Sequence, residues 1–415
     1  MIKRLKGFSD LFPPEVDKYL LIERMAREVF PLYNFKEVRI PILEKTELFA
    51  RSIGDATDVV QKEMFSFEDK KGRVLSLRPE ATAGVVRAYI ENKIYAKESI
   101  SKFFTIGPMF RYERPQKGRQ RQFHQVNVEV FGSSSPFIDS EIICMLMHFL
   151  ERLNINDVVL EINSLGCSSC RREYQKALKD FLDRLDEREL CDDCRVRREK
   201  NPLRVLDCKS PNCQRLYESA PTILDFICED CKKHFSSVQN TLKKQNIDFV
   251  INKRLVRGLD YYQRTTFEVV AKGIGAQSAI AGGGRYDGLV KLLGGPDVPG
   301  MGFACGMERL VQLISFEKQD KLDCYIAPLV EHALDIAFEI SFKLREKQLR
   351  SECLYDVKSP KAHLRYAHKI GANFAFLIGE EELKNRTITV KNLSTGNQSH
   401  VLIDDILNGN FTFLK

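Results

Sequence analysis

Residues 110–124 have the sequence FRYERPQKGRQRQFH, a basic segment between two runs of residues with strand character. Residues 103–106 and 109–112 before it, and 123–131 after it, are rich in β-branched and aromatic residues and predict strands. The segment is therefore expected to be a long hairpin in an antiparallel sheet. Its guanidinium groups can bind phosphates in pairs of hydrogen bonds. The alternative is a solvated loop without a ligand.

The strand that follows this hairpin supports a binding site. Alternation places Val126, Val128 and Val130 on one face of the strand and puts Gln125, Asn127 and Glu129 on the other. Polar groups on a strand otherwise flanked by valines indicate the floor of a pocket, although an exposed face would have the same pattern. Glu268, in TTFEVV, has a similar placement on a later predicted strand.

Further elements extend the pattern on both sides of the hairpin. Apolar residues at helical spacing predict helices at 14–30, 79–96 and 135–153. Short β-branched runs predict additional strands at 38–42, 73–78, 265–270 and 276–282.

Glycine-rich segments follow in the second half. RGLDYY at 257–262 and GGGRYDG at 282–288 allow close approach of the backbone to a ligand, or form tight turns. GMGFACGMER at 300–309 has the wrong glycine spacing for a dinucleotide-binding loop of the GxGxxG type. A glycine-lined strand that leads into a helix carrying Arg309 suits a site where a nucleotide lies against the sheet.

Length and composition limit the class of protein. The chain has 415 residues, 43% hydrophobic residues and a net charge of +7, which excludes a single small module. No apolar stretch is long enough for a membrane span, and no secretory signal follows the basic first residues, so a cytoplasmic protein without a membrane partner is expected. We expect a strand-rich unit at 1–322, a helical insertion at 160–250 within it, and a small α/β unit at 323–415.

The insertion contains most of the twelve cysteines. Eight of them form four closely spaced pairs: Cys167 and Cys170, Cys191 and Cys194, Cys208 and Cys213, and Cys228 and Cys231. This spacing is typical of zinc ligands, and thiolate coordination could hold one or two Zn²⁺ ions as structural metals. Reduced thiols without a metal are the alternative.

Several of these segments together resemble those of the histidyl-tRNA synthetases. FRYE resembles motif 2 of class II aminoacyl-tRNA synthetases, and GMGFACGMERL resembles motif 3. RGLDYYQRTTFEV and AGGGRYDGL resemble the two signature segments of the family, and RPEAT and KGFSDLFPPE fit it as well. The resemblance covers about residues 6–402, with Phe8 where the family more often has Thr. It implies an α+β fold in which helices flank a mainly antiparallel sheet, followed by an α/β anticodon-binding domain.

The resemblance also implies an activity. A histidine–tRNA ligase activates histidine with ATP to histidyl-adenylate and transfers it to the 3′ end of tRNA(His), with Mg²⁺ as a further cofactor. By resemblance, Arg111 holds the α-phosphate and Arg309 the γ-phosphate, while Glu113 and Arg119 help to bind ATP. Arg257 stabilises the charge that develops at the α-phosphate.

The same resemblance assigns the other substrates. The expected histidine-binding residues are Glu80, Thr82, Gln125, Glu129, Arg257, Tyr262 and Tyr286. Arg114 and Gln116, in the basic hairpin, are expected to contact the acceptor end of tRNA. Residues 35–41 resemble motif 1, which implies a homodimer.

Two other classes of protein share some of these features. The first is a non-catalytic histidine-sensing regulatory paralogue of ATP phosphoribosyltransferase, but such paralogues typically lack the anticodon-binding domain and lose ATP-site residues. The second is a zinc-dependent nucleic-acid-binding protein without enzymatic activity, which leaves the glycine-flanked signatures without a role. A synthetase would turn over ATP, whereas a protein of either of these two classes would not.

Overall fold

The structure is a computed structural model, and it describes residues 2–54, 57, 59–116, 118–257, 259, 261–273, 278–315 and 322–410. The chain divides into two compact units, residues 1–315 and 316–415. The first six residues of the second unit, 316–321, lie outside the described residues, and they make up most of the predicted linker. Among the described residues, no helix is long and apolar enough to cross a membrane.

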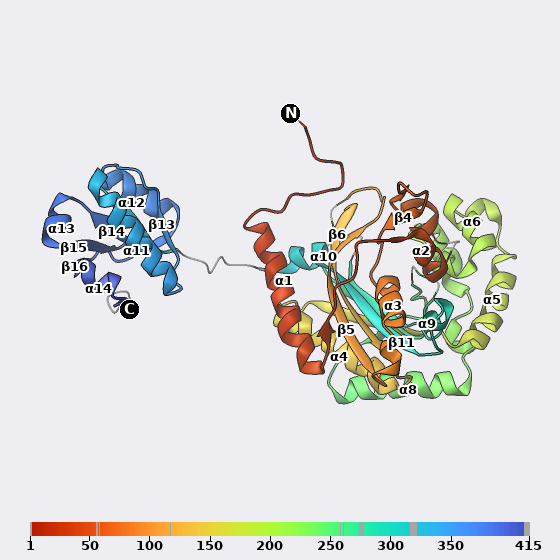
Figure 1. Cartoon of the computed structure of the whole chain (residues 1–415). Helices are drawn as coiled ribbons and strands as arrows, with labels where there is room; N and C mark the ends of the chain where they lie inside the picture. Colours follow the sequence, from red (N-terminus) through yellow and green to blue (C-terminus); the bar gives the residue numbers. More distant parts are fainter. Residues whose placement is uncertain are drawn as a thin grey trace. The chain divides into compact units, whose positions relative to one another are not determined.

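An eight-stranded sheet forms the centre of the first unit (Figure 1). In spatial order its strands are β1 (Lys36–Glu37), β5 (Ser101–Phe110), β6 (Gln122–Phe131), β11 (Gly300–Gly306), β10 (Ala279–Arg285), β9 (Gln263–Ala271), β7 (Val158–Ser164) and β8 (Val250–Ile251). Only the outermost pairs, β1 with β5 and β7 with β8, are parallel. The expected mainly antiparallel sheet is therefore confirmed.

The two strands predicted before the basic hairpin are one strand. β5 pairs with β6 over its whole length, from Ser101 opposite Phe131 to Phe110 opposite Gln122. Pro108 does not interrupt it, because β1 pairs with β5 only near Phe103 and leaves this part of β5 at the edge of the sheet. A proline without an N–H group is tolerated at such an edge. The Pro108 carbonyl accepts a hydrogen bond from the Arg78 side chain, at 2.9 Å.

The strand predicted at 38–42 was wrong. These residues form no strand and connect β1 to β2 (Leu43–Lys45). Pro41 has no N–H group to pair, and the Ile40 carbonyl accepts a hydrogen bond from the Arg78 side chain at 3.0 Å instead of from a neighbouring strand. A side chain distant in sequence therefore replaces the sheet partner that the apolar pattern suggested.

Helices and a small second sheet surround the main sheet. The predicted helices are present as α1 (Glu15–Val29), α3 (Thr82–Glu91) and α4 (Pro136–Arg152). The others are α2 (Thr46–Ile53), α9 (Leu289–Leu292) and α10 (Met307–Leu313), and the small sheet has the order β2, β4 (Val74–Leu77), β3 (Ser66–Glu68). α4 begins where expected, because the Ser135 hydroxyl accepts a hydrogen bond from the Phe137 amide.

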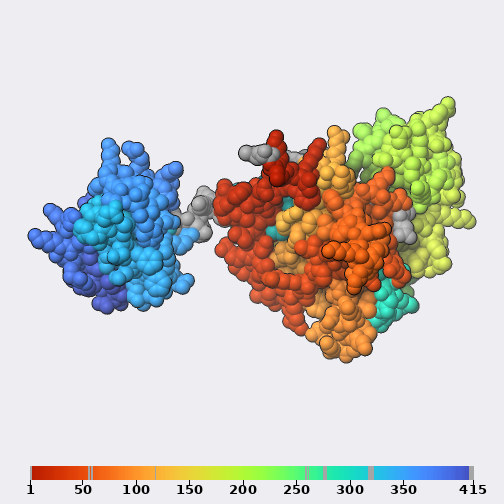
Figure 2. Space-filling model, turned by 45° about the horizontal axis from the view of Figure 1, so that its top comes forward, coloured from red at the N-terminus to blue at the C-terminus, as the bar shows by residue number. Residues whose placement is uncertain are grey.

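The cysteine-rich insertion follows β7, which is itself part of the main sheet. Its helices are α5 (Ser168–Leu182), α6 (Asp192–Lys200), α7 (Pro211–Leu216) and α8 (Glu229–Lys244), with the short 3₁₀ helix η5 (Pro202–Asp207). α5 and α6 lie beside each other at one side of the unit, whereas α8 contacts α4 (Figure 1). In the space-filling view the insertion forms a yellow-green lobe (Figure 2).

The second unit is a five-stranded sheet with helices. The strand order is β13 (Ser351–Cys353), β12 (Leu322–Pro328), β14 (Ala372–Ile378), β15 (Thr387–Asn392) and β16 (Gln398–Leu402). The helices are α11 (Leu334–Glu346), α12 (Pro360–Lys369), α13 (Glu380–Asn385) and α14 (Ile403–Leu407). The first three strands are parallel, and α11 packs on β12 and β13, which is the predicted α/β alternation.

Candidate active site

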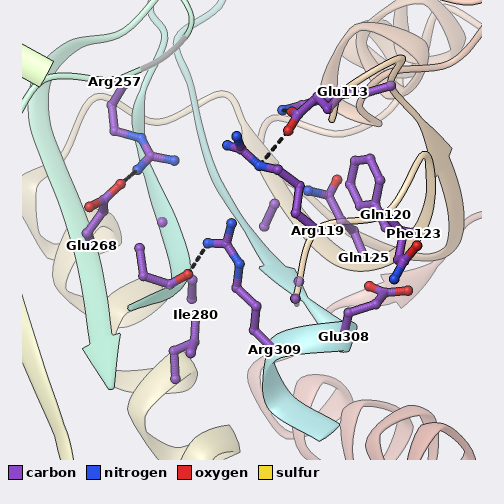
Figure 3. A pocket seen from close by; sticks show the side chains of 17 residues that line it. Glu113, Arg119, Gln120, Phe123, Gln125, Arg257, Glu268, Ile280, Glu308 and Arg309 are labelled. Atoms are coloured by element: carbon purple, nitrogen blue, oxygen red, sulfur yellow. Dashed lines mark hydrogen bonds and ion pairs between the residues drawn. The ribbon is translucent and has the colours of Figure 1, made fainter. Parts of the chain in front are cut away.

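An open pocket with a volume of about 200 Å³ lies over the middle of the main sheet. Its walls come from the basic hairpin, β6, β9, β10, β11 and α10 (Figure 3). The lining residues with charged side chains are Arg111, Glu113, Arg119, Arg257, Glu268, Glu308 and Arg309. Segments far apart in the sequence therefore contribute to one site.

Four arginines point their side chains into this pocket. Arg111 is oriented by a hydrogen bond from its Nε to the Pro79 carbonyl, at 2.9 Å. Arg119 is paired with Glu113, Arg257 with Glu268, and Arg309 donates to the Ala279 carbonyl (Figure 3).

The electrostatics of these arginines favour an anionic ligand. Burial, together with the neighbouring Arg119, lowers the pKa of Arg309. Positive charges held close together in a partly buried site repel each other and are stabilised when an anion binds between them. Arginine forks suit phosphate oxygens, so the pocket fits a polyphosphate.

Two polar atoms beside the pocket lack partners. Among the described residues, Gln125 Oε1 and Arg257 Nε are buried and form no hydrogen bond. Both residues line the pocket. Buried polar groups are nearly always paired in folded proteins, and an unpaired acceptor and donor here indicate a ligand that pairs with them.

A buried polar cluster is built beside the arginine pocket, where α3 begins. Glu80 accepts hydrogen bonds from the Thr82 and Ala83 amides at 2.6 and 2.8 Å, and these are the first amides of α3. The Thr82 hydroxyl donates to Glu129 Oε1 at 2.6 Å, and the Tyr286 hydroxyl donates to Glu129 Oε2. We call Glu80, Thr82, Glu129, Tyr262 and Tyr286 the carboxylate cluster.

The carboxylate cluster adjoins the pocket through Arg257 and the tyrosines. The Arg257 guanidinium lies 5.6 Å from the centre of the Tyr262 ring. Tyr261 connects the two tyrosines of the cluster, with ring centres 4.7 Å from Tyr262 and 5.7 Å from Tyr286. The pocket and the cluster are therefore neighbouring parts of one site.

The two carboxylates of the cluster are buried without a cation. Glu80 and Glu129 are 5% and 2% exposed, and within the described part of the chain their hydrogen-bond partners are amides and hydroxyl groups, with no cationic side chain within ion-pair distance. Burial raises the pKa of Glu129 to about 8, against the hydrogen bonds from Thr82 and Tyr286. Burial also raises the pKa of Glu80. A ligand with an ammonium group or an N–H donor would supply the missing partners.

Glycines allow the close contacts within the site. A Cβ atom at Gly282 would lie 2.4 Å from the Arg257 guanidinium. A Cβ at Gly302 would lie 2.1 Å from Glu129 Oε2. Any larger residue would displace these functional groups, which explains why both glycine-rich segments lie here.

The predicted site residues fall into three groups. Those assigned to ATP, together with Gln125 and Arg257, line the open pocket, and the others assigned to histidine form the carboxylate cluster. Arg114 and Gln116 are exposed and do not line the pocket.

Sequence reasoning missed two residues of the site. Glu308 lines the pocket and accepts from the His124 amide at 2.8 Å, and its position directly before Arg309 could have indicated it. Tyr261, partly buried and in contact with the rings of both tyrosines of the cluster, could have been found in the same signature segment as Tyr262.

The eight paired cysteines form two clusters. The first contains Cys167, Cys170, Cys228 and Cys231, and the second contains Cys191, Cys194, Cys208 and Cys213. In each, the ligand atoms lie within 4.8 Å of one another. The first pair along the chain is thus joined to the last, and the two middle pairs are joined to each other.

Comparison with known proteins agrees with this geometry. The sequence model of the family described as histidyl-tRNA synthetase matches residues 7–310, and the model described as anticodon binding domain matches 323–409. A histidine–tRNA ligase of Maridesulfovibrio salexigens is 53% identical over 405 residues, which is 97% of this chain and 98% of the relative. One of Geobacter metallireducens is 50% identical, at 97% and 98% coverage.

A solved structure is similar as well. The apo histidyl-tRNA synthetase of S. aureus superimposes with a TM-score of 0.83 at 34% identity, and the match covers all of both chains.

Proposed function

This chain belongs to the histidyl-tRNA synthetase family and joins histidine to tRNA(His), and from that premise we propose where each substrate binds and which residues act on it. ATP binds in the arginine pocket, and histidine binds in the carboxylate cluster beside it. The histidine carboxylate then attacks the α-phosphorus, a new O–P bond forms, and pyrophosphate leaves. In the second step, a hydroxyl of the terminal adenosine of tRNA attacks the carbonyl of the adenylate, and AMP leaves.

The arginines stabilise charge in the first step. Arg111, fixed by the Pro79 carbonyl, is aimed at the α-phosphate, and Arg309 at the γ-phosphate. Arg257 lies where the pocket meets the cluster, because it lines the pocket and stacks over Tyr262. Transfer at phosphorus requires alignment and charge stabilisation more than proton transfer, so these arginines carry most of the catalysis.

Histidine suits the carboxylate cluster because it carries the groups that the cluster lacks. Its α-ammonium would pair with Glu80, and an imidazole N–H would donate to Glu129. Thr82 and Tyr286 hold the Glu129 carboxylate in place through their hydroxyl groups. A site built to satisfy these groups rejects amino acids that leave them unpaired.

The two buried carboxylates without a cation are the observation that carries this assignment. It is tested by ATP–pyrophosphate exchange with each of the twenty amino acids. Exchange with histidine alone is expected. Exchange with no amino acid, in protein that still binds histidine, would favour the regulatory paralogue.

The raised pKa of Glu129 predicts a pH dependence. Because its pKa is about 8 in the free enzyme, the carboxylate is mostly protonated at pH 6 and becomes ionised as the pH rises to 8. The carboxylate must be ionised to accept the imidazole N–H. We expect kcat/KM for histidine to rise up to about tenfold per pH unit between pH 6 and pH 8, while the KM for ATP changes little.

The control for this prediction is Glu129→Gln, which cannot titrate. Its profile retains only the ionisation of histidine itself and of other groups. If the variant and the parent had the same slope, Glu129 would not be the group that sets the pH dependence.

Mg²⁺ accompanies ATP in this proposal and supplies charge neutralisation at the phosphates. Carboxylate oxygens suit this ion, and the residues present fit it, since Glu113, Glu268 and Glu308 line the pocket. The arginines position the nucleotide, while these carboxylates could hold the ion.

We assign structural zinc to the two cysteine clusters. A tetrahedral ion with Zn–S bonds of about 2.3 Å holds its sulfurs about 3.8 Å apart. Cys167 and Cys170 have their sulfurs 3.4 Å apart, and Cys191 and Cys208 theirs 3.6 Å apart. The Cys228 amide also donates to the Cys170 sulfur at 3.1 Å, as expected around a thiolate.

Elemental analysis of protein purified without chelators is therefore expected to find two zinc ions per chain. Cys213→Ser should remove one ion, and Cys324→Ser, which changes a cysteine outside both clusters, should remove none. Metal-free wild-type protein with eight titratable thiols in the insertion would contradict this assignment.

The remaining partners follow from exposed features. Arg114 and Gln116 are exposed on the basic hairpin, where the end of a tRNA could reach them. β1, within the motif 1 segment 35–41, lies at the edge of the main sheet, which supports dimerisation through this edge. A cytoplasmic location fits an enzyme that charges tRNA and thiols that remain reduced.

A further inference from the structure

Two arginines of the insertion contact the segment that carries Arg257 and Tyr262. Arg204 Nη1 donates to the Arg257 carbonyl at 3.2 Å. Arg171 Nη1 donates to the Tyr262 carbonyl at 2.9 Å. The insertion therefore holds this segment, which we call the catalytic segment (257–262), at its first and its last residue. Gly258 and Asp260, between them, lie outside the described residues.

Each of these arginines is tied to one cysteine cluster. Arg171 directly follows Cys170, and its amide donates to the Cys167 carbonyl at 3.0 Å. Arg204 lies in η5, between Cys194 and Cys208 of the second cluster, and its side chain is 15% exposed. A shift of either cluster would therefore move the guanidinium that holds the catalytic segment.

The core of the insertion depends on its cysteines. Five of its buried core residues are cysteines of the two clusters: Cys170, Cys194, Cys208, Cys213 and Cys231. Several other residues of the same core, such as Val205 and Tyr217, come from short 3₁₀ helices. Small folds of this kind usually require a metal to become ordered.

The first cluster is also fixed to the frame of the main unit. His234, in the helix that begins after Cys228, is buried and its Nε2 lies 2.7 Å from Asp139 Oδ2. Asp139 is bound in turn by the buried Arg285, which is the last residue of β10 and directly precedes Tyr286. The first cluster is thus attached to the main sheet through His234, Asp139 and Arg285, and Arg171 extends from the cluster to the catalytic segment.

We propose that Arg171 and Arg204 are positioning residues, held by two metal-loaded Cys₄ sites, that fix the two ends of the catalytic segment for histidine activation. This inference rests on the proposed function. Arg204 sets the backbone of Arg257, which stabilises the transition state, so it acts on kcat. Arg171 sets the backbone of Tyr262 in the histidine site, so it acts on the KM for histidine.

The test uses the full chain and three alanine variants. Arg204→Ala is expected to lower kcat of histidine-dependent ATP–pyrophosphate exchange about tenfold, with little change in the KM for ATP. Arg171→Ala is expected to raise the KM for histidine about tenfold. Arg188→Ala is the matched control, since Arg188 lies in the same insertion, is 89% exposed and pairs with Asp186. It should behave as the parent.

A second pair of measurements separates positioning from folding. Circular dichroism gives the fraction of folded enzyme, and Arg204→Lys, which keeps a donor, should recover part of the kcat. If the activity of Arg204→Ala falls only with the folded fraction, or if Arg171→Ala and Arg204→Ala both match Arg188→Ala, the inference is overturned.

Metal removal tests the connection to the clusters. A thiol-directed mercurial with a chelator, followed by removal of the mercurial, should lower kcat and speed hydrogen exchange at the Tyr262 and Gln263 amides, and added Zn²⁺ should reverse both effects. Unchanged kcat and exchange in metal-free protein would overturn the inference. If the untreated parent protein has no histidine-dependent exchange activity at all, the proposed function itself is contradicted.

Discussion

Replacement of Arg257 by alanine is expected to lower kcat of histidine-dependent ATP–pyrophosphate exchange by about 10²- to 10³-fold. Its guanidinium is paired with Glu268 and lies against Tyr262, at the junction of the phosphate and histidine sites. A preoriented charge at this place stabilises the transition state without reorganisation. Arg257→Lys keeps the charge but not the planar fork, and should recover only part of the rate.

A neighbouring arginine provides the control. Arg254 is exposed and precedes Arg257 by three residues, and its amide is bound by the Asn252 side chain. Arg254→Ala should keep the parental kcat. An exchange rate for Arg257→Ala within threefold of the parent would show that the charge at the α-phosphate is stabilised by other residues.

Replacement of Glu129 by alanine is the second change with a large expected effect. It removes the carboxylate that accepts the imidazole N–H and leaves the Thr82 and Tyr286 hydroxyl groups without their acceptor. We expect kcat/KM for histidine to fall on the order of 10³-fold, because unpaired buried groups weaken both ligand binding and the transition state. The KM for ATP should change little.

Graded variants test the same point. Glu129→Gln keeps the shape and one acceptor oxygen, so its loss should be smaller than that of Glu129→Ala. Because the pKa of Glu129 is raised when folded, the carboxyl contributes stability below its unfolded pKa of about 4.5 that is lost as the pH rises through about 8. Glu129→Gln should therefore be more stable than the parent at pH 8, and equal or lower stability would contradict the buried, unpaired carboxylate.

The sequence predicted the centre of the fold well because its signals are local. Alternation in β6 placed Gln125 and Glu129 on one face, and both belong to the site. The Ser135-Pro136 pair predicted the start of a helix, and the structure has α4 there. Signals of this kind depend on residues within one element, where period and capping chemistry are fixed by backbone geometry.

Contacts between distant residues could not be predicted in the same way. The side chain of Arg78 binds carbonyls at Ile40 and Pro108, and the contact with Ile40 replaces the sheet partner of a predicted strand. The grouping of cysteine pairs into clusters also depends on the path of the chain, since four pairs can be combined in several ways. Neither feature has a periodic signal.

The position of residues relative to the pocket needed the structure as well. The motifs named Arg111 and Arg309, but only the fold shows that Glu308 joins them by binding the His124 amide. Similarly, the contacts of Arg171 and Arg204 with backbone carbonyls leave no trace in a motif. A hydrogen bond to a carbonyl requires no particular residue type on the accepting side.

The most direct test of the central claim is the charging of tRNA(His) with labelled histidine, measured beside a tRNA specific for another amino acid. The enzyme with intact arginine pocket and carboxylate cluster is expected to transfer histidine to tRNA(His) alone, in an ATP-dependent reaction that releases AMP and pyrophosphate. Histidine-dependent binding without ATP turnover or charged tRNA would contradict the claim that this site performs both steps.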